Sequence, residues 1–303
     1  MSTSISTHTS LPNFIADFKS ITKFRLAVSV VFSSVAGYLL GVDQVNLWHI
    51  VYLALGGYAM VGASNAFNQI IEKDLDAKMD RTKSRPLPAG RMSKSYAFII
   101  ASILTLIGIY LLYIINPITA MFGAISIFIY TSLYTPLKTK TPLAVFVGAI
   151  PGAIPFMLGW VAASGNFGIE PGTLFMIQFF WQFPHFWALG WWLYDDYKKG
   201  GFFMLPTGKR DKGTAVQIVL YTIWTIIVSL IPVLNITGDF YITPISAIII
   251  FALGIYMLSK AIKLYKTKQV KASKQLMLAS VTYITLIQIV YVADKYVRSW
   301  MEI

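Results

Sequence analysis

Residues 47–80 read LWHIVYLALGGYAMVGASNAFNQIIEKDLDAKMD. The first part, 47–71, is an apolar run long enough to cross the hydrocarbon core of a bilayer, which takes about 20 helical residues. A segment rich in asparagine and acids follows without a break. This stretch therefore predicts a membrane helix that continues into a polar, acidic end.

Eight further apolar runs flank this one. The nine predicted spans are 26–41, 47–71, 96–115, 118–134, 143–163, 174–194, 215–234, 241–258 and 276–293. The composition agrees, because 56% of the 303 residues are hydrophobic and only 13% are charged, about half the charged fraction of a soluble domain. We therefore predict an all-α, polytopic membrane protein with nine transmembrane helices. It forms a single domain over 1–303, with a solvated N-terminal tail at 1–20.

The basic residues predict the orientation. All lysines and arginines except Lys295 and Arg298 lie in the N-terminal segment or in the second, fourth, sixth and eighth loops. Cytoplasmic loops carry the positive excess, so we predict a multi-pass protein of the cell membrane with a cytoplasmic N-terminus and an external C-terminus. The formal charge of +12 would suggest nucleic acid in a soluble protein. Beside apolar runs it instead favours membrane lipid or an anionic substrate, and no nucleic acid.

Two loops carry similar sequences. Leu87-Pro-Ala-Gly-Arg91 follows the second run, and Leu205-Pro-Thr-Gly-Lys209 follows the sixth. Each comes after acids at the end of an apolar run, and the two loops lie four helices apart. This predicts two related four-helix halves plus a ninth helix, with a site between the halves. Chance similarity of two turns is the alternative.

The acidic end of the second run carries candidate metal ligands. Asn68, Glu72, Asp76 and Asp80 are spaced four apart, so a continuing helix would place them on one face. Hard oxygen ligands of this kind suit Mg²⁺, which is bound by one or two carboxylates together with substrate phosphates. A solvated loop of mixed charge is the alternative, but Asn68 and Glu72 still lie at the end of an apolar run.

Basic residues follow the ridge formed by Asn68, Glu72, Asp76 and Asp80. Arg81, Lys83 and Arg85 come directly after it, and Lys138 closes the fourth run on the same side of the membrane. Acids that hold Mg²⁺ beside a basic cluster suit a diphosphate. Lys138 could also serve only to fix the topology.

A second cluster lies in the sixth run, where residues 181–187 read WQFPHFW. His185 lies within this span, whereas His49 is near the outer interface and His8 is in the N-terminal tail. An ionisable residue at membrane depth is a functional hypothesis. A neutral histidine bonded to Gln182 or Gln178, among ordinary packing aromatics, is the alternative. Asp195 and Asp196 follow at the cytoplasmic end.

The first motif resembles a known family. Asn68-xxx-Glu72-xxx-Asp76, followed by Arg81-Thr82 and by RPLPAG at 85–90, resembles the first acidic motif of the UbiA-type intramembrane prenyltransferases. Tyr134-Thr-Pro-Leu-Lys138 is similar to a Tyr-xxx-Lys segment of that family. The resemblance covers nearly the whole chain. It implies an all-helical bundle of nine spans in two four-helix halves, with a cavity facing the cytoplasm.

The second motif resembles one branch of this family, whose members prenylate heme. The similarity rests on WQFPHFWAL at 181–189, Asp196-Tyr197 and Met204-Leu-Pro206. Branches that act on quinone precursors carry a second Asp-xxx-Asp motif. The matching stretch here, 191–195, reads WWLYD and keeps only the last acid, which argues against a quinone acceptor.

The resemblance implies a Mg²⁺-dependent transfer of farnesyl from farnesyl diphosphate to a vinyl group of protoheme IX (heme b). The product would be heme o, in heme o and heme a biosynthesis for terminal oxidases. Heme b is then a substrate and Mg²⁺ the cofactor, and a downstream heme a synthase is a candidate partner.

The same resemblance assigns roles to residues. The implied catalytic residues are Asn68, Glu72, Asp76 and Asp196. The implied diphosphate ligands are Arg81, Lys83, Arg85 and Lys138. The implied heme contacts are His185, Trp187 and Tyr134. The implied Mg²⁺ ligands are Asn68, Glu72, Asp76, Asp80, Asp195 and Asp196.

Two other functions fit part of the pattern. One is prenyl transfer to a quinone ring or another aromatic acceptor. The other is a heme or lipid transporter, which would also use a midplane site and broken helices. A transporter has no need for an acidic ridge next to a basic cluster, so Mg²⁺-dependent consumption of a prenyl diphosphate would separate the two classes.

Overall fold

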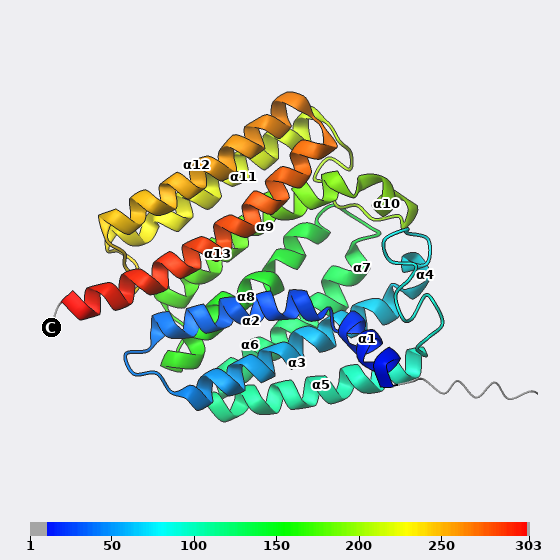
Figure 1. Ribbon diagram of the computed structural model, residues 1–303, viewed down its shortest axis with the longest axis horizontal. Helices are drawn as coiled ribbons and strands as arrows, with labels where there is room; N and C mark the ends of the chain where they lie inside the picture. The colour runs from blue at the N-terminus through cyan, green and yellow to red at the C-terminus, as the bar shows by residue number, and fades with distance from the viewer. Residues whose placement is uncertain (1–10, 302–303) are drawn as a thin grey trace, which may run out of the picture.

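The computed structural model describes residues 11–301, which form helices and contain no strand. Figure 1 shows the helices as one bundle. The elements are α1 (Leu11–Ile21), α2 (Phe24–Gly41), α3 (Leu47–Ile71), α4 (Lys73–Asp76), α5 (Lys94–Ile115), α6 (Pro117–Phe128), the π-helix η1 (Ile129–Tyr134), α7 (Thr135–Leu137), α8 (Ala144–Ser164), α9 (Ile169–Trp192), α10 (Tyr194–Lys199), α11 (Lys212–Leu230), the 3₁₀-helix η2 (Ile231–Leu234), α12 (Pro244–Thr267) and α13 (Val270–Met301).

The predicted membrane spans are largely confirmed. Within residues 11–301, eight helical segments are long and apolar enough to cross a membrane, with Pro117–Leu137 and Lys212–Leu234 each counted as one. The predicted sixth span corresponds to α9, which has 24 residues. Its glutamines and His185 lower its hydropathy, and α9 is not among the eight. The chain is a multi-pass membrane protein, and the count of nine stays a prediction.

The helices pack as two groups that share α8. In the first group α2 contacts α3 and α8, α3 contacts α5, and α6 contacts α5 and α8. In the second, α9 contacts α8, α11 and α13, while α12 contacts α11 and α13. The two groups also meet where α2 touches α13. A hydrophobic core fills each group.

Glycines bring α2 and α8 together at the centre of the bundle. A Cβ atom at Gly37 would collide with the carbonyl of Phe156, and one at Gly159 would collide with the carbonyl of Ser34. Small residues at such a crossing let two membrane helices approach at backbone distance. This contact fixes α2 against α8, the helix that both groups share.

The two similar loops adopt the same turn. Gly90 and Gly208 have φ angles of 74° and 75°, a left-handed conformation that favours glycine. Their amides donate to the carbonyls of Leu87 (3.2 Å) and Leu205 (2.9 Å), and both leucines are fully buried. The loops follow α4 and α10, which extend α3 and α9 at the same end of the bundle (Figure 1). The shared geometry supports an internal repeat.

The prediction of a solvated tail through residue 20 is wrong from Leu11 onward. Residues 1–10 lie outside the described residues, but α1 is a helix that folds against the end of α3. Its Asp17 is buried and accepts from Arg91 at 3.0 Å. The Gln69 side chain donates to the carbonyl of Ile21 at 2.8 Å. These contacts between sequence-distant polar groups hold α1 in place.

Candidate active site

Three of the four predicted ridge residues share one buried face. The helical hydrogen bonds continue from α3 into α4, since the Glu72 amide donates to Asn68 (2.9 Å) and the Asp76 amide to Glu72 (2.7 Å). Asn68, Glu72 and Asp76 therefore stack one turn apart, as the spacing predicted. They are only 1%, 3% and 1% exposed. Three polar side chains are thus buried at the end of an apolar helix.

The ridge ends at Asp76. There α4 ends, and the Thr82 hydroxyl donates to the Asp76 carbonyl at 2.8 Å, which turns the chain back. The Asp80 side chain is 63% exposed and forms ion pairs with Lys199 and with Lys83 (2.7 Å). Hydrogen bonds from these two lysines lower the pKa of Asp80 to about 2. The prediction that Asp80 lies on the same face is wrong, because the helix does not continue that far.

Each buried acid has its own cation. Lys138 Nζ lies 2.7 Å from Glu72 Oε1, and Arg85 Nη1 lies 2.6 Å from Asp76 Oδ2. A buried carboxylate needs such a partner, because removal from water is costly for an unpaired charge. Burial by itself would lower the pKa of Lys138, but the Glu72 carboxylate raises it above its usual value. The pairs leave buried Asp76 Oδ1 with no hydrogen-bond partner within residues 11–301.

The π-helix orients Asn68. Asn68 Nδ2 donates to the Thr135 hydroxyl at 3.2 Å, and this hydroxyl donates in turn to the carbonyl of Tyr130 at 2.8 Å. The Asn68 amide nitrogen is therefore held toward η1, which leaves its carbonyl oxygen on the opposite side. A π-helix often marks a functional site. Here it sets the position of a residue one turn from Glu72.

Tyr134 closes η1 beside Lys138. The Lys138 ammonium lies 4.6 Å from the centroid of the Tyr134 ring and 5.5 Å from that of Phe202. Gly148 on α8 makes room for the ring, because a Cβ atom there would lie 2.6 Å from it. Two aromatic faces therefore line the position of a cation next to Glu72.

Lys23 joins this cluster, and it was not among the predicted site residues. It connects α1 to α2 with a left-handed φ of 48°. Burial and the nearby charges of Arg85 and Lys138 lower the pKa of Lys23 to about 7. The one available signal was a lysine at the foot of the first span, which the topology alone would explain.

The two acids of α10, Asp195 and Asp196, bind to neighbouring loops. Asp196 accepts hydrogen bonds from the amides of Asp80 (2.7 Å) and Arg81 (3.3 Å), and so ties α10 to the loop after α4. Asp195 pairs with Arg210 at 2.9 Å. In the part of the chain that the structure describes, no three His, Asp or Glu residues gather as a metal site. Asp195 and Asp196 are engaged by Arg210 and by the loop after α4, and their place in the implied Mg²⁺ set stays a prediction.

The four predicted diphosphate ligands divide into two pairs. Arg85 and Lys138 lie beside the buried acids, as described above. The Arg81 guanidinium instead lies 5.8 Å from the Tyr197 ring, and Lys83 pairs with exposed Asp80. The inner pair can reach a ligand bound at the ridge, whereas the outer pair surrounds the loop.

His185 faces α13 and contacts Ser280. Its Nδ1 lies 2.9 Å from the Ser280 hydroxyl, which donates its single hydrogen to the carbonyl of Met277 at 2.7 Å. This arrangement suits a donor Nδ1–H, the tautomer that leaves the Nε2 lone pair available. Gln182, one of the partners considered from the sequence, donates to the Ala149 carbonyl instead (2.8 Å).

The three implied heme contacts do not meet at one place. His185 is half-buried and stacks on Trp181 with ring centroids 4.7 Å apart. Trp187 is buried against Tyr221 at 4.9 Å, on another side of α9. Tyr134 belongs to the Lys138 cluster. Only His185 keeps a geometry suited to a metal centre.

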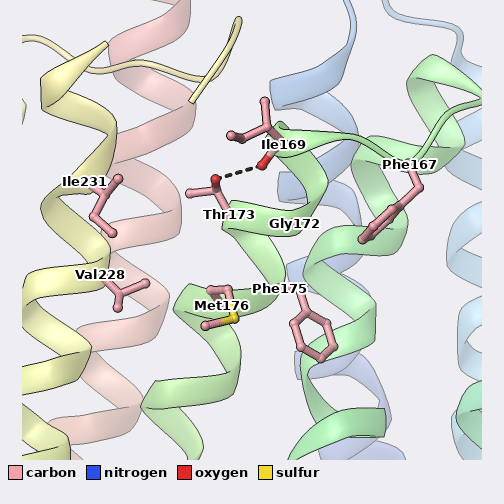
Figure 2. A pocket seen from close by; sticks show the side chains of 8 residues that line it. All are labelled: Phe167, Ile169, Gly172, Thr173, Phe175, Met176, Val228 and Ile231. Carbon is pink, nitrogen blue, oxygen red and sulfur yellow. Dashed lines mark hydrogen bonds between the residues drawn. The ribbon is translucent and has the colours of Figure 1, made fainter. Parts of the chain in front are cut away.

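A separate apolar groove lies at the other end of α9. It has a volume of about 400 Å³ and is shown in Figure 2. Its one hydroxyl, on Thr173, donates to the carbonyl of Ile169 at 2.7 Å. Because α9 runs the length of the bundle between this groove and α10, the groove does not belong to the acidic site.

Known proteins resemble the chain in sequence and in fold. The sequence profile of the UbiA prenyltransferase family matches residues 30–285. A relative from Christiangramia forsetii, called protoheme IX farnesyltransferase, is 71% identical over 97% of this chain and 98% of its own length. A UbiA homologue from Aeropyrum pernix K1, in its apo form, shares the fold with a TM-score of 0.71 and 19% identity, over 91% of this chain and 98% of that one. A UbiA homologue from Archaeoglobus fulgidus, bound to GPP and Mg²⁺, has a TM-score of 0.66 and 15% identity. The match covers 91% of this chain and 99% of that one.

Proposed function

The chain belongs to the UbiA prenyltransferase family, and from that premise we propose that it transfers a farnesyl group from farnesyl diphosphate to a vinyl group of protoheme IX, giving heme o. Relatives that are 63–71% identical over nearly the whole chain carry the name protoheme IX farnesyltransferase. The observation that carries the proposal is the buried face of Asn68, Glu72 and Asp76 with its two cations. Such a face suits a multiply charged leaving group at the end of an apolar bundle.

We propose that Asn68, Glu72 and Asp76 hold Mg²⁺. The donor set fits, because Asp76 Oδ1 is buried without a partner in the described range and Thr135 turns the Asn68 carbonyl oxygen away from η1. A homologue with the same fold binds Mg²⁺ together with GPP. When bound, the ion would neutralise the leaving diphosphate as a Lewis acid. Asp80, Asp195 and Asp196 are left out of this set, because each is engaged in the loops.

The basic residues supply the rest of the diphosphate site. Arg85 and Lys138 now pair with Asp76 and Glu72, and a metal ion on these acids would free both cations for phosphate oxygens. Charge-assisted hydrogen bonds of this kind are about twice as strong as neutral ones. Lys23 adds a third positive charge when it is protonated.

The surroundings of the site protect the reacting carbon. As the C–O bond to diphosphate breaks, positive charge develops on the allylic carbon of the farnesyl group. The rings of Tyr134 and Phe202 already face a cation, and such a contact contributes about 0.5–2 kcal/mol. The apolar spans on either side keep water from the cation until the new carbon–carbon bond has formed.

We propose that His185 binds the acceptor, heme b. The Nδ1–H bond to Ser280 fixes its ring, as a second hydrogen bond usually does for a histidine that binds a metal. Its Nε2 lone pair can then bind the heme iron and orient the vinyl group. After transfer, the carbon next to the ring is left cationic and takes up hydroxide from water, so that one proton and one diphosphate are released.

For the membrane orientation, we propose that the loops after α3 and α9 face the cytoplasm. The support is the basic residues at this end, and the absence of native cysteine makes a test simple. A cysteine at Lys83 should react with an impermeant reagent only in opened cells, and one at Asp239 should react in intact cells. Labelling of position 83 from outside would reverse the orientation.

The function is tested by expressing the chain in cells that make heme b but no heme o. A pigment extract should contain heme whose mass has increased by one farnesyl group and one hydroxyl group. The Asp76→Asn variant, produced at the same level, should give heme b alone. A prenylated quinone in place of heme o would point to the other acceptor class, and unchanged pigments would refute enzymatic transfer to heme.

A further inference from the structure

One face of α9 carries a stripe of mostly aromatic residues, and a lysine of α13 lies beside its last member. Trp181, His185, Leu189 and Trp192 follow at helical spacing, so they share one face, and all four are half-buried. The stripe faces α13, because the Trp181 indole donates to the Ser280 carbonyl at 2.6 Å and His185 bonds to the hydroxyl of the same residue. At the cytoplasmic end of the stripe, Lys274 Nζ lies 4.9 Å from the centroid of the Trp192 ring.

The charge of Lys274 is not paired with an acid in the described part of the chain. Its side chain is exposed, and it has no ion pair among residues 11–301. The sequence contains no acid between Asp239 and Asp294, so its own hairpin supplies none. The contact with Trp192 fixes the direction of the side chain without neutralising its charge. An anion beside Trp192 would meet this ammonium group.

The spacing along the stripe fits the acceptor of the proposed reaction. His185 and Trp192 are two turns apart, roughly 10 Å along the axis at 1.5 Å per residue. Protoheme IX is a flat, apolar ring with iron at its centre and two propionate carboxylates at one edge. The distance from iron to carboxylate is comparable with this spacing. The carboxylates would also lie toward the aqueous end, where a charge avoids the cost of the hydrocarbon core.

We propose that Lys274 binds a propionate of the heme acceptor, with His185 at the iron and Trp192 against the edge of the ring. This inference rests on the proposed function and names a residue that determines its acceptor specificity. Lys274 lies on α13, apart from the Lys138 and Arg85 pairs that serve the diphosphate. It therefore acts on heme and leaves farnesyl diphosphate binding unaffected.

The test compares heme b with its dimethyl ester, in which both propionates are uncharged. Purified full-length protein in lipid nanodiscs is titrated with each compound and followed by the Soret band. Wild type should bind heme b about tenfold more tightly than the ester, as expected for one charged hydrogen bond. Lys274→Gln should lose this preference, and Lys274→Arg should keep most of it. Lys263→Gln, which removes an exposed charge from α12, should behave as wild type.

Three results would overturn the role of Lys274. One is an unchanged preference for heme b in Lys274→Gln. Another is equal weakening of acid and ester, which would mean that the lysine only supports Trp192. The third is a change in the KM for farnesyl diphosphate as large as the change for heme. Failure of the proposed function would look different, because wild type itself would then form no farnesylated heme.

Discussion

Thr135 offers a test of the metal site that leaves every proposed ligand in place. Its hydroxyl accepts from Asn68 Nδ2 at 3.2 Å, so the Thr135→Val variant keeps the shape of the side chain but releases the amide. A buried hydrogen bond contributes about 0.5–1.5 kcal/mol. If this bond orients the Asn68 oxygen for the metal, its loss should raise the half-saturating Mg²⁺ concentration by about 2- to 10-fold.

The assay measures diphosphate release against free Mg²⁺, at fixed farnesyl diphosphate and heme b. At saturating Mg²⁺ the rate of Thr135→Val should stay within about twofold of wild type, because the orientation is then restored by metal binding. Thr135→Ser keeps the hydroxyl and should restore the Mg²⁺ dependence. Thr139→Val is the matched control, since the Thr139 hydroxyl donates only to the carbonyl of Pro136 (3.3 Å).

The reasoning would be refuted by an unchanged Mg²⁺ dependence in Thr135→Val. It would also be refuted by an equal shift in Thr139→Val, because that residue does not contact Asn68. A loss of rate that saturating Mg²⁺ fails to restore would assign the hydroxyl to the folding of η1 instead.

Three further predictions concern single residues. Lys23 has a pKa of about 7, so it is charged below that pH and neutral above it. Because the neutral form no longer attracts the diphosphate, the KM for farnesyl diphosphate should rise as pH increases through 7. Lys23→Arg, which stays charged, should flatten this rise. An identical pH profile for the variant would exclude Lys23 from the site. Gly148→Ala should remove most activity, because its Cβ would lie 2.6 Å from the Tyr134 ring, whereas Gly172→Ala meets nothing within 4 Å and should be silent. Asp80→Asn should retain activity within about twofold if its ion pairs only brace the surface, and a complete loss of Mg²⁺ response would return Asp80 to the ligand set.

The buried ridge could be predicted because its geometry is local. Asn68, Glu72 and Asp76 are one helical turn apart, and the apolar run before them shows that the helix continues. The period of four also suggested Asp80. The helix stops before it, because the Thr82 hydroxyl and the Asp196 carboxylate bind the backbone of the turn. Nothing in the local spacing gives either bond.

For the cations of the site, the sequence predicted their location but not their individual partners. The sequence placed basic residues near the cytoplasmic end of the spans, as the topology requires. It could not tell that Lys138 reaches Glu72, because this pair depends on how α7 packs against α3. Lys83 pairs with Asp80 only three residues away, and both face outward because the helix ends before Asp80. Lys23 was missed for the same reason as the Lys138 pair. Its charge matches the topology, and only the fold places it among Arg85 and Lys138.

The sixth span shows how function can weaken a signal of the fold. Gln178, Gln182 and His185 lower the hydropathy of α9, yet all three connect it to neighbouring helices. Gln182 binds the Ala149 carbonyl, and Gln178 accepts from Gln288 at 3.1 Å. The aromatic stretch around His185 was recognisable from the sequence. The contact between this histidine and Ser280 was not, because Ser280 lies on the last helix.

The central claim is that the Asn68, Glu72 and Asp76 face carries out farnesyl transfer to heme. The most direct measurement combines purified protein in nanodiscs with heme b, isotope-labelled farnesyl diphosphate and Mg²⁺, and follows the pigment by mass spectrometry. We expect the label in heme o with wild type, and none with chelator or with Asp76→Asn. Labelled heme o formed at the wild-type rate by Asp76→Asn, or in full chelation, would contradict the account.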